Sequence, residues 1–300
     1  MELRWLASAS TSSLHAAAVI LHGRRIADEQ LAGALQASAQ LLHQEIDAVA
    51  ESPWRLLQEL IPLSASIDNN RQLTETAVSK AFGPDSVNET TVTHIAGAVA
   101  ELEAAFRGHA PEALAELETR GRLLREQWET RGPGMLHVIE RLAPEPLLVE
   151  QADVVLVQPV SGGDGEAFLR MNRVTMEGVL ADAEAKLPEV VRLGWLLSTL
   201  NLDVPVLGET VPGSRLPWIS KLAMLPLAMQ AAAEVEWCQD DPANIELAVA
   251  RWIPGRDDAS RVSGVVNKWW DTYQAARPRW SVAMAALDRA LSEQSLAPPL

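Results

Sequence analysis

The stretch that decides the fold is VVLVQPVSGGDGEAFLRMNRV, residues Val154–Val174, because the hydrophobic period of the chain changes there. A β-branched run enters a glycine-rich loop, and a segment in which apolar and polar residues alternate leaves it. Alternation with period two is typical of a strand, and glycine and aspartate suit a tight turn because they tolerate positive φ. We therefore expect two strands joined by this loop, in a small antiparallel sheet around residues 153–180. Pro159, near the end of the first strand, predicts that this strand either stops early or lies at an edge of the sheet.

The loop itself, Gly162-Gly163-Asp164-Gly165, also permits a phosphate-binding interpretation. It resembles the glycine-rich signature of the NAD and diacylglycerol kinase superfamily, in which phosphates approach the loop backbone and the aspartate assists phosphoryl transfer. Here Glu166 stands where that family has a threonine. The alternating segment that follows predicts a strand, not a helix whose N-terminus could bind an anion. The residues favour the turn, and the four loop residues are candidate ligand-binding residues under the alternative.

Upstream of this stretch, apolar residues recur three, four or seven positions apart, which is typical of amphipathic helices. The expected helices cover residues 28–52, a segment capped by Ser52 that starts at Pro53, a segment from a Ser86/Glu89 capping box to Gly108, and a segment from Pro111 to Gly132-Pro133-Gly134. Residues 1–145 should thus form an all-helical region, whose first 25 residues are a structural element and not a signal peptide. It should meet a mixed region, residues 146–300, and both should pack as one compact unit.

Downstream, residues 187–200 are apolar almost all round, which predicts a helix buried on most of its surface with Trp195 in the central core. Further helices are expected over residues 217–239, 242–252, 260–276 and 280–292. The fold class that follows is α+β, predominantly helical with one small sheet.

The strand RVTMEGVLA and the buried helix VVRLGWLLSTLNLD that follows it resemble the sheet edge and active-site helix of zinc-dependent metallopeptidases of the zincin class. In that class the helix carries HExxH, and a further ligand, often a glutamate, lies on a later helix. Arg192 and either Trp195 or Leu196 stand at the positions of the two histidines, and Leu193 stands at the position of the general base. Glu234 or Glu236 corresponds to the later ligand. Because HExxH is missing, the resemblance implies a zincin-like fold that has lost its chemistry.

The chain is strongly acidic, with 40 Asp and Glu against 25 Lys and Arg and a formal net charge of -15. Binding to nucleic acids and to anionic membranes draws on clustered cationic charge, so neither is an expected partner. Cys238 is the only cysteine, which excludes an intrachain disulfide and favours a reducing compartment. No window reaches the roughly 18 apolar residues of a membrane span. We expect a cytoplasmic protein whose partner is a protein or a small molecule, and a homo-oligomer stays open.

No motif of catalysis or metal binding is present in the sequence. There is no HExxH, no G-x-S-x-G elbow and no Walker loop. The six histidines are scattered over the front half: His15, His22, His43, His94, His109 and His137. We therefore expect no catalytic residue, no bound metal and no cofactor.

Tryptophan is unusually frequent, with ten residues against one tyrosine and three phenylalanines. We expect Trp252, Trp269 and Trp280 to fill the core where helices meet. Neighbouring residues of a helix point about 100° apart, so one ring of the adjacent pair Trp269 and Trp270 can face solvent. Trp270 is therefore a candidate for contact with a ligand or partner.

Two hypotheses of function follow. The first is a non-catalytic cytoplasmic binding or interaction protein on an inactive zincin-like scaffold. The second is a phosphotransferase-type enzyme that uses the Gly162–Glu166 loop on a phosphorylated small molecule. A strand after Gly165 favours the first hypothesis, whereas a helix there, with amides of Gly163 and Gly165 converging on an anion, favours the second.

Overall fold

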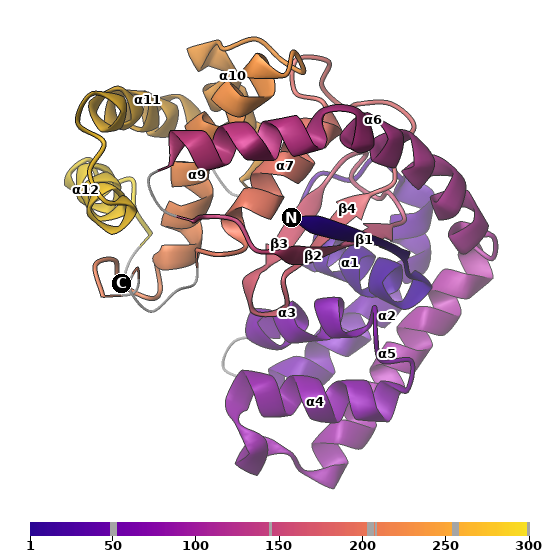
Figure 1. The fold of residues 1–300 in the computed structure, drawn as a ribbon. Coiled ribbons are helices and arrows are strands. Elements are labelled where there is room, and N and C mark those ends of the chain that lie inside the picture. Colours follow the sequence, from indigo (N-terminus) through magenta and orange to yellow (C-terminus); the bar gives the residue numbers. More distant parts are fainter. Residues whose placement is uncertain (49–52, 144–145, 203–206, 208, 254–257, 299–300) are drawn as a thin grey trace.

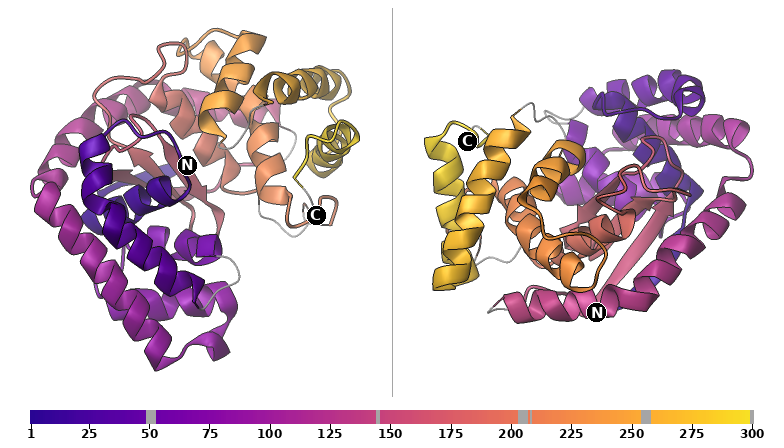
Figure 2. Two further views of the ribbon diagram at one scale, coloured as in Figure 1. Left: turned by 180° about the vertical axis from the view of Figure 1, so that it is seen from behind. Right: turned by 90° about the horizontal axis from the view of Figure 1, so that it is seen from above.

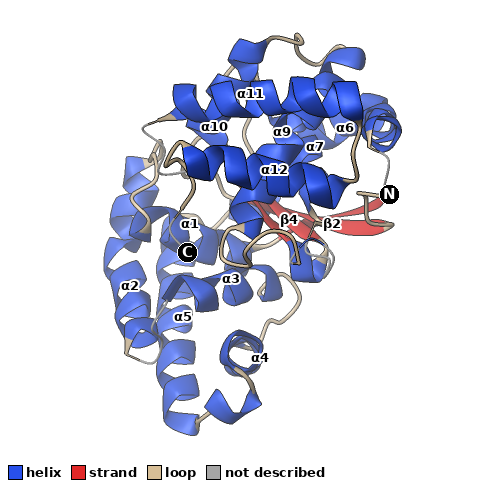
Figure 3. Ribbon diagram, turned by 90° about the vertical axis from the view of Figure 1, so that its left-hand side faces the viewer, coloured by secondary structure: helices blue, strands red, loops and turns tan. Residues whose placement is uncertain are grey.

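A four-stranded sheet lies at the centre of the described part of the chain (Figure 1). The structure is a computed structural model that describes residues 1–48, 53–143, 146–202, 207, 209–253 and 258–298. The strands β1 (Glu2–Ala7), β2 (Gln151–Val157), β3 (Gly165–Phe168) and β4 (Arg173–Glu177) stand in the order β1-β2-β4-β3. Helices cover both faces (Figure 3), so the predicted α+β, predominantly helical class is confirmed. The sheet is mixed, however, because β1, β2 and β4 run parallel and only β3 is antiparallel.

The predicted hairpin across the glycine-rich loop is wrong, because β4 lies between β2 and β3. The loop carries the chain from β2 past β4 to the edge strand β3, which then pairs with β4. The turn between β3 and β4 is a short 3-10 helix, Leu169–Met171, followed by Asn172 at φ 47°. Asparagine tolerates this left-handed backbone, so a turn can form inside the alternating segment. The single strand predicted after the loop is therefore two strands, β3 and β4. Strand β2 ends before Pro159 and lies inside the sheet, so of the two alternatives that this proline allows, the early end is the one observed.

The front region is not all helical, because β1 joins the sheet from the other end of the sequence. Its residues pair in parallel with β2, for example Glu2 with Gln151 and Trp5 with Val154. The strand is only six residues long and its burial alternates weakly. A segment this short gives little periodic signal, and its partner strand lies far away in the sequence. The sequence therefore does not predict this strand.

Six helices and a 3-10 turn follow β1 among the described residues of the front region, and the first five helices and the turn precede residue 110. They are α1 (Ala9–Leu21), α2 (Glu29–Asp47), α3 (Pro53–Leu63), α4 (Asn70–Phe82), η1 (Pro84–Ser86) and α5 (Glu89–His109). Asp28 caps α2 by accepting a hydrogen bond from the amide of Leu31, at the predicted start. Asn88, not Ser86, caps α5, which continues past Gly108. The predicted cap at Ser52 lies outside the described residues.

Helix α6 (Ala113–Leu142) runs through Gly132-Pro133-Gly134, where the sequence predicts a break. Tertiary packing decides this, because Met135 and Ile139, beyond the expected break, are fully buried. Gly132 faces the ring of Trp128 so closely that a side chain there would collide with the ring. Burial of this face offsets the weak helix propensity of glycine and the missing amide of proline.

The remaining helices are α7 (Glu189–Thr199), α9 (Leu216–Glu234), α10 (Pro242–Trp252), α11 (Ala259–Ala276) and α12 (Trp280–Glu293). Every residue of α7 is buried, and Trp195 is 1% exposed, as the sequence predicts. Gly194 lets Met135 of α6 lie against α7, since a side chain at Gly194 would collide with it. Among the described residues, no helix has the length and apolar character that crossing a membrane requires.

Two hydrophobic cores occupy the two sides of the sheet. Figure 2 shows the indigo and purple helices α1–α5 gathered on one side and the orange and yellow helices α9–α12 on the other. One core extends from Leu14 to Ala113 and adds Val160 and Phe168, and the other begins at Leu117 in α6. The cores therefore meet along α6 and the sheet, and the strands of both sequence halves hold them together.

Candidate functional site

The carboxylate of Glu177, at the end of β4, is the anchor of the glycine-rich loop. Its Oε1 accepts hydrogen bonds from the amides of Val160 and Ser161, both at 2.9 Å, and its Oε2 accepts from the amide of Gly163 at 2.8 Å. The imidazole Nε2 of His15, on α1, lies 3.0 Å from Oε1. Glu177 is fully buried, so the loop is wrapped around an anion that belongs to the protein itself.

Positive φ angles at Gly162 (77°) and Gly163 (126°) give the loop this shape. Successive amides that turn to one side form a concave anion-binding arrangement, and glycine adopts the required backbone without a steric penalty. Burial by itself raises the pKa of Glu177, but His15 and the loop amides outweigh burial and lower the pKa. Glu177 therefore stays ionised and fills the concave face of the loop.

Asp164 and Glu166, on either side of Gly165, form ion pairs with cations from two distant segments. Nη1 of Arg24, which follows α1, lies 2.9 Å from Oδ2 of Asp164, and Nη2 lies 3.5 Å from Oε2 of Glu166. Lys221 of α9 pairs with the other oxygen of Glu166. The expected ligand-binding residue Asp164 is thus engaged within the protein, and its Oδ1 also accepts the amide of Gly165 at 2.8 Å.

A second buried ion pair extends this cluster into α7. Nη2 of Arg192 lies 3.3 Å from Oε1 of Glu189, and Nη1 lies 3.7 Å from Oδ1 of Asp164. The guanidinium of Arg192 stands 5.4 Å from the ring centre of Trp252, a cation–π contact. Burial raises the pKa of Glu189 to about 7, with Arg192 opposing and nearby carboxylates adding to the shift. Glu189 is therefore the carboxylate of this cluster that can take up a proton near neutral pH.

The positions that the zincin resemblance singles out lie in different environments. Arg192 faces Asp164 and Glu189, whereas Leu193, Trp195 and Leu196 belong to the hydrophobic core. Glu234 and Glu236 pair instead with arginines of α6, Arg141 and Arg131 respectively. Among the described residues, no group of three or more His, Cys, Asp and Glu side chains could hold a metal ion.

A groove with a volume of about 1080 Å³ runs along β3, between α3 and the start of α9. Lys221 and Glu166 pair near the beginning of β3, and Arg170 and Glu59 pair beyond its end. The described residues that line the groove are Arg55, Gln58, Glu59, Pro62, Glu166, Ala167, Phe168, Leu169, Arg170, Met171, Thr199, Gly213, Ser214, Leu216, Pro217, Ser220 and Lys221. The groove therefore combines apolar surface with charged groups along one edge of the sheet.

The backbone of Ala167 faces this groove. The amide of Glu177 donates to the carbonyl of Asp164 at 2.9 Å, so these two residues are a hydrogen-bonded pair in the register of β3 and β4. Bonded and non-bonded pairs alternate along antiparallel strands, so Glu166 and Phe168 turn their backbone groups toward β4. Ala167 consequently turns its N–H and C=O toward the free edge.

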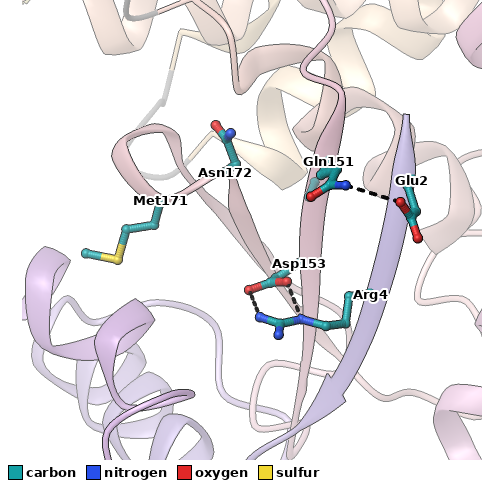
Figure 4. A pocket seen from close by; sticks show the side chains of 7 residues that line it. Glu2, Arg4, Gln151, Asp153, Met171 and Asn172 are labelled. Carbon is teal, nitrogen blue, oxygen red and sulfur yellow. Dashed lines mark hydrogen bonds and ion pairs between the residues drawn. The ribbon is translucent and has the colours of Figure 1, made fainter.

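A smaller cavity of about 400 Å³ lies at the beginning of β1 and β2, and its charged side chains pair with one another (Figure 4). Nε and Nη2 of Arg4 each lie 2.8 Å from an oxygen of Asp153, and Gln151 donates to Glu2 at 3.2 Å. Burial opposes ionisation of Asp153, but hydrogen bonds from Arg4 and Arg173 outweigh it and lower its pKa. The charged groups of this cavity are thus engaged with one another or with Arg173.

Trp270 is buried, at 8% exposure, so the expectation of an exposed ring is wrong. It stacks on Tyr273 with ring centres 5.2 Å apart, and Trp269 is buried beside it. The predicted core positions of Trp252, Trp269 and Trp280 are confirmed. Trp269 and Tyr273 contact Trp280 of α12, and Trp270 stacks on Tyr273, so both rings of the adjacent pair belong to one aromatic cluster.

Sequence reasoning missed most residues of this site. For Glu177 the sequence contains one local signal, because it is a carboxylate in a largely apolar strand. A carboxylate buried in such a strand needs a hydrogen-bond or charge partner. Arg24, Lys221 and Glu59 gave none, because only the fold brings them to the loop and the groove.

The fold and site together define an α+β protein with a charged cluster at the carboxyl ends of its parallel strands and a groove beside its edge strand. Comparison with protein-family models, curated proteins and solved structures finds no match.

Proposed function

We propose that this chain is a non-catalytic binding protein that holds an extended segment of another protein along the free edge of β3. The observation that carries the proposal is the backbone of Ala167, which turns its N–H and C=O toward a groove of about 1080 Å³. An extended peptide can add to such an edge as a further strand, with main-chain hydrogen bonds giving affinity and side-chain contacts giving specificity.

The scaffold that we propose for this function is zincin-like and lacks HExxH. Its support is the order of the elements: an antiparallel edge strand, β4 leading to the buried helix α7, and α9 packed against α7. Arg192 stands about where the first histidine of that motif would be, and its cation already pairs with Asp164 and Glu189. We place the protein in the cytoplasm, since a lone cysteine is typical of a reducing compartment.

The phosphotransferase alternative has less support. The segment after Gly165 is a strand, so no helix N-terminus stands there to bind a phosphate. The amide of Gly163 donates to Glu177, and Asp164 is held by Arg24. A phosphate would have to displace an ionised, fully buried carboxylate before it reached these amides.

The proposal is tested with a labelled peptide library of the form Thr-Val-Xaa-Val-Thr, in which Xaa is varied and binding is followed by fluorescence polarisation. We expect wild type to bind a subset of the library. Ala167→Pro should weaken that binding by about tenfold or more, because it removes the outward N–H that a peptide carbonyl would accept from. Ala167→Ser keeps the amide and nearly the same volume, so it should bind like wild type.

Circular dichroism and thermal melts distinguish lost binding from lost structure. Proline is tolerated on an edge strand where its missing N–H faces outward, so Ala167→Pro should stay folded. Phe168→Pro, which removes an amide that faces β4, should disturb the sheet. Absence of binding to every library member, or equal binding by folded Ala167→Pro and wild type, would refute the proposal.

A further inference from the structure

Glu59 is a buried carboxylate with spare hydrogen-bonding capacity in the wall of the groove. The residue is 7% exposed, and its Oε1 lies 3.5 Å from Nη1 of Arg170. Its Oε2 is buried and has no hydrogen-bond partner among the described residues. A buried acceptor left without a donor destabilises the protein, and a further donor would recover that free energy.

The ion pair between Arg170 and Glu59 is weak. The side chain of Arg170 is 65% exposed and belongs to the short turn after β3, so solvent screens the interaction. The separation of 3.5 Å is also longer than a charge-assisted hydrogen bond, which is about 2.8 Å. Arg170 can therefore leave the carboxylate with little loss when a better cation arrives.

The other charged groups of the groove are engaged elsewhere. Both oxygens of Glu166 are paired, one with Lys221 and one with Arg24. Arg55, on α3 with Glu59, holds its guanidinium 5.7 Å from the ring centre of Phe82. The chain as a whole carries a net charge of -15, which attracts cationic segments over a distance.

We infer that the groove selects a segment carrying a lysine or arginine side chain, whose cation replaces Arg170 at the carboxylate of Glu59. The inference rests on the proposed function, because it names the chemistry of the segment that the edge of β3 holds. In the free protein Arg170 occupies the place of the incoming cation and keeps Glu59 from being buried without a partner.

The test scans one lysine through each position of a seven-residue Thr/Val peptide and compares each peptide with its norleucine counterpart, which has the same length without the charge. At one position, wild type should prefer lysine by about tenfold, the effect of one added charge-assisted hydrogen bond. Glu59→Gln should reduce this preference to less than about twofold while still binding the norleucine peptide.

Arg170→Gln supplies the second measurement. It should raise the affinity for the lysine peptide by about threefold or more, since the competing cation is gone. Arg125→Gln is the matched control, because it removes the same charge from an exposed position of α6 that is not among the described lining residues of the groove, and it should change the affinity by less than about twofold.

The outcomes separate the two proposals. Peptides that bind equally well with lysine and norleucine, or a lysine preference that survives Glu59→Gln, would overturn this inference and leave the edge-strand groove in place. Failure of all peptides, norleucine ones included, would overturn the proposed function.

Discussion

The imidazole Nε2 of His15 lies 3.0 Å from Oε1 of Glu177, and this buried contact joins α1 to the end of β4. The same oxygen accepts the amides of Val160 and Ser161, so one carboxylate fixes a helix, a strand and the glycine-rich loop together. The loop is neither a hairpin tip nor an empty phosphate cradle, because its inner face is filled from within.

Glu177→Gln should lower the free energy of unfolding by about 2–4 kcal/mol, because an amide accepts fewer hydrogen bonds than a carboxylate and loses the charge that strengthens them. Urea denaturation followed by far-UV circular dichroism measures this. Glu246→Gln, at an exposed position of α10, is the control and should stay within about 0.5 kcal/mol of wild type. A Glu177→Gln variant as stable as the control would show that the carboxylate does not organise the loop.

Glu189 should make the protein less stable as the pH rises. Burial raises its pKa from 4.5 to about 7, so the folded state binds this proton more tightly than the unfolded state does. The resulting stabilisation is complete below about pH 4.5 and is lost as the pH rises through about 7. The loss amounts to about 3 kcal/mol at about 1.4 kcal/mol per unit of pKa difference.

Urea melts of wild type and Glu189→Gln at about pH 5 and pH 8 isolate this contribution. The difference in unfolding free energy between the two proteins should shift in favour of the variant at the higher pH. Other groups that titrate in both proteins contribute equally and cancel in this difference. One of them is His22, whose pKa is lowered by burial and, to a smaller extent, by Arg24. A difference that stays constant with pH would mean that Glu189 titrates normally.

Gly165→Ala should destabilise the protein by about 1–3 kcal/mol, the usual penalty of overpacking. A Cβ at this position would lie 2.7 Å from the backbone oxygen of Thr175 and 2.8 Å from Cδ1 of Leu196. The oxygen belongs to β4 and cannot easily move. Gly33→Ala, in α2 with no atom within 4 Å of the added Cβ, should instead stabilise by about 0.5–1 kcal/mol. Thermal melts that show both variants on the same side of wild type would contradict this.

Trp195→Ala should lower the unfolding free energy by about 3–5 kcal/mol, since it removes a buried ring and its packing. The ring stacks on Trp252 at 5.3 Å, and its Nε1 donates to the carbonyl of Lys221 at 2.9 Å. Trp270→Ala should also cost more than about 2 kcal/mol, because that ring is buried too. Leu180→Ala is the control at 62% exposure, and a similar loss there would indicate general fragility.

Purified protein should contain no stoichiometric zinc, and EDTA should leave its melting temperature unchanged. The expectation rests on the sequence, which lacks HExxH, and on the described side chains, which form no cluster suited to a metal. Elemental analysis after refolding with added zinc checks it. One zinc per chain, resistant to dialysis, would show that ligands converge and would revive a metal-dependent function.

Caps and hydrophobic periodicity predict the helices well where tertiary packing favours the same helix. Asp28 caps α2, α10 has the predicted bounds, and the uniformly apolar helix α7 is buried as its composition indicates. The signals failed where a distant partner decided the outcome. Gly132-Pro133-Gly134 indicates a break, but the buried face of α6 keeps the helix intact through it.

The candidate site was harder to predict, because its parts are joined only by topology. The glycines of the loop indicate a turn, yet its partner Glu177 lies on β4, which stands between the two strands that a hairpin would pair directly. The groove depends on β3 being an edge strand, and strand order cannot be read from alternation. The burial of Trp270 depends on how α11 packs against other helices, which the residue spacing within α11 does not reveal.

The parallel pairing of β1 with β2 has a consequence for how the chain folds. Glu2 finds its partner Gln151 only after a loop of about 150 residues has closed, and such long-range closures slow folding. During synthesis at about 5–20 residues per second, β1 waits roughly 7–30 s for β2 to be made. Through that interval its backbone hydrogen-bonding groups are unsatisfied by the sheet, so the nascent chain carries an open strand that a chaperone, or another nascent chain, can capture.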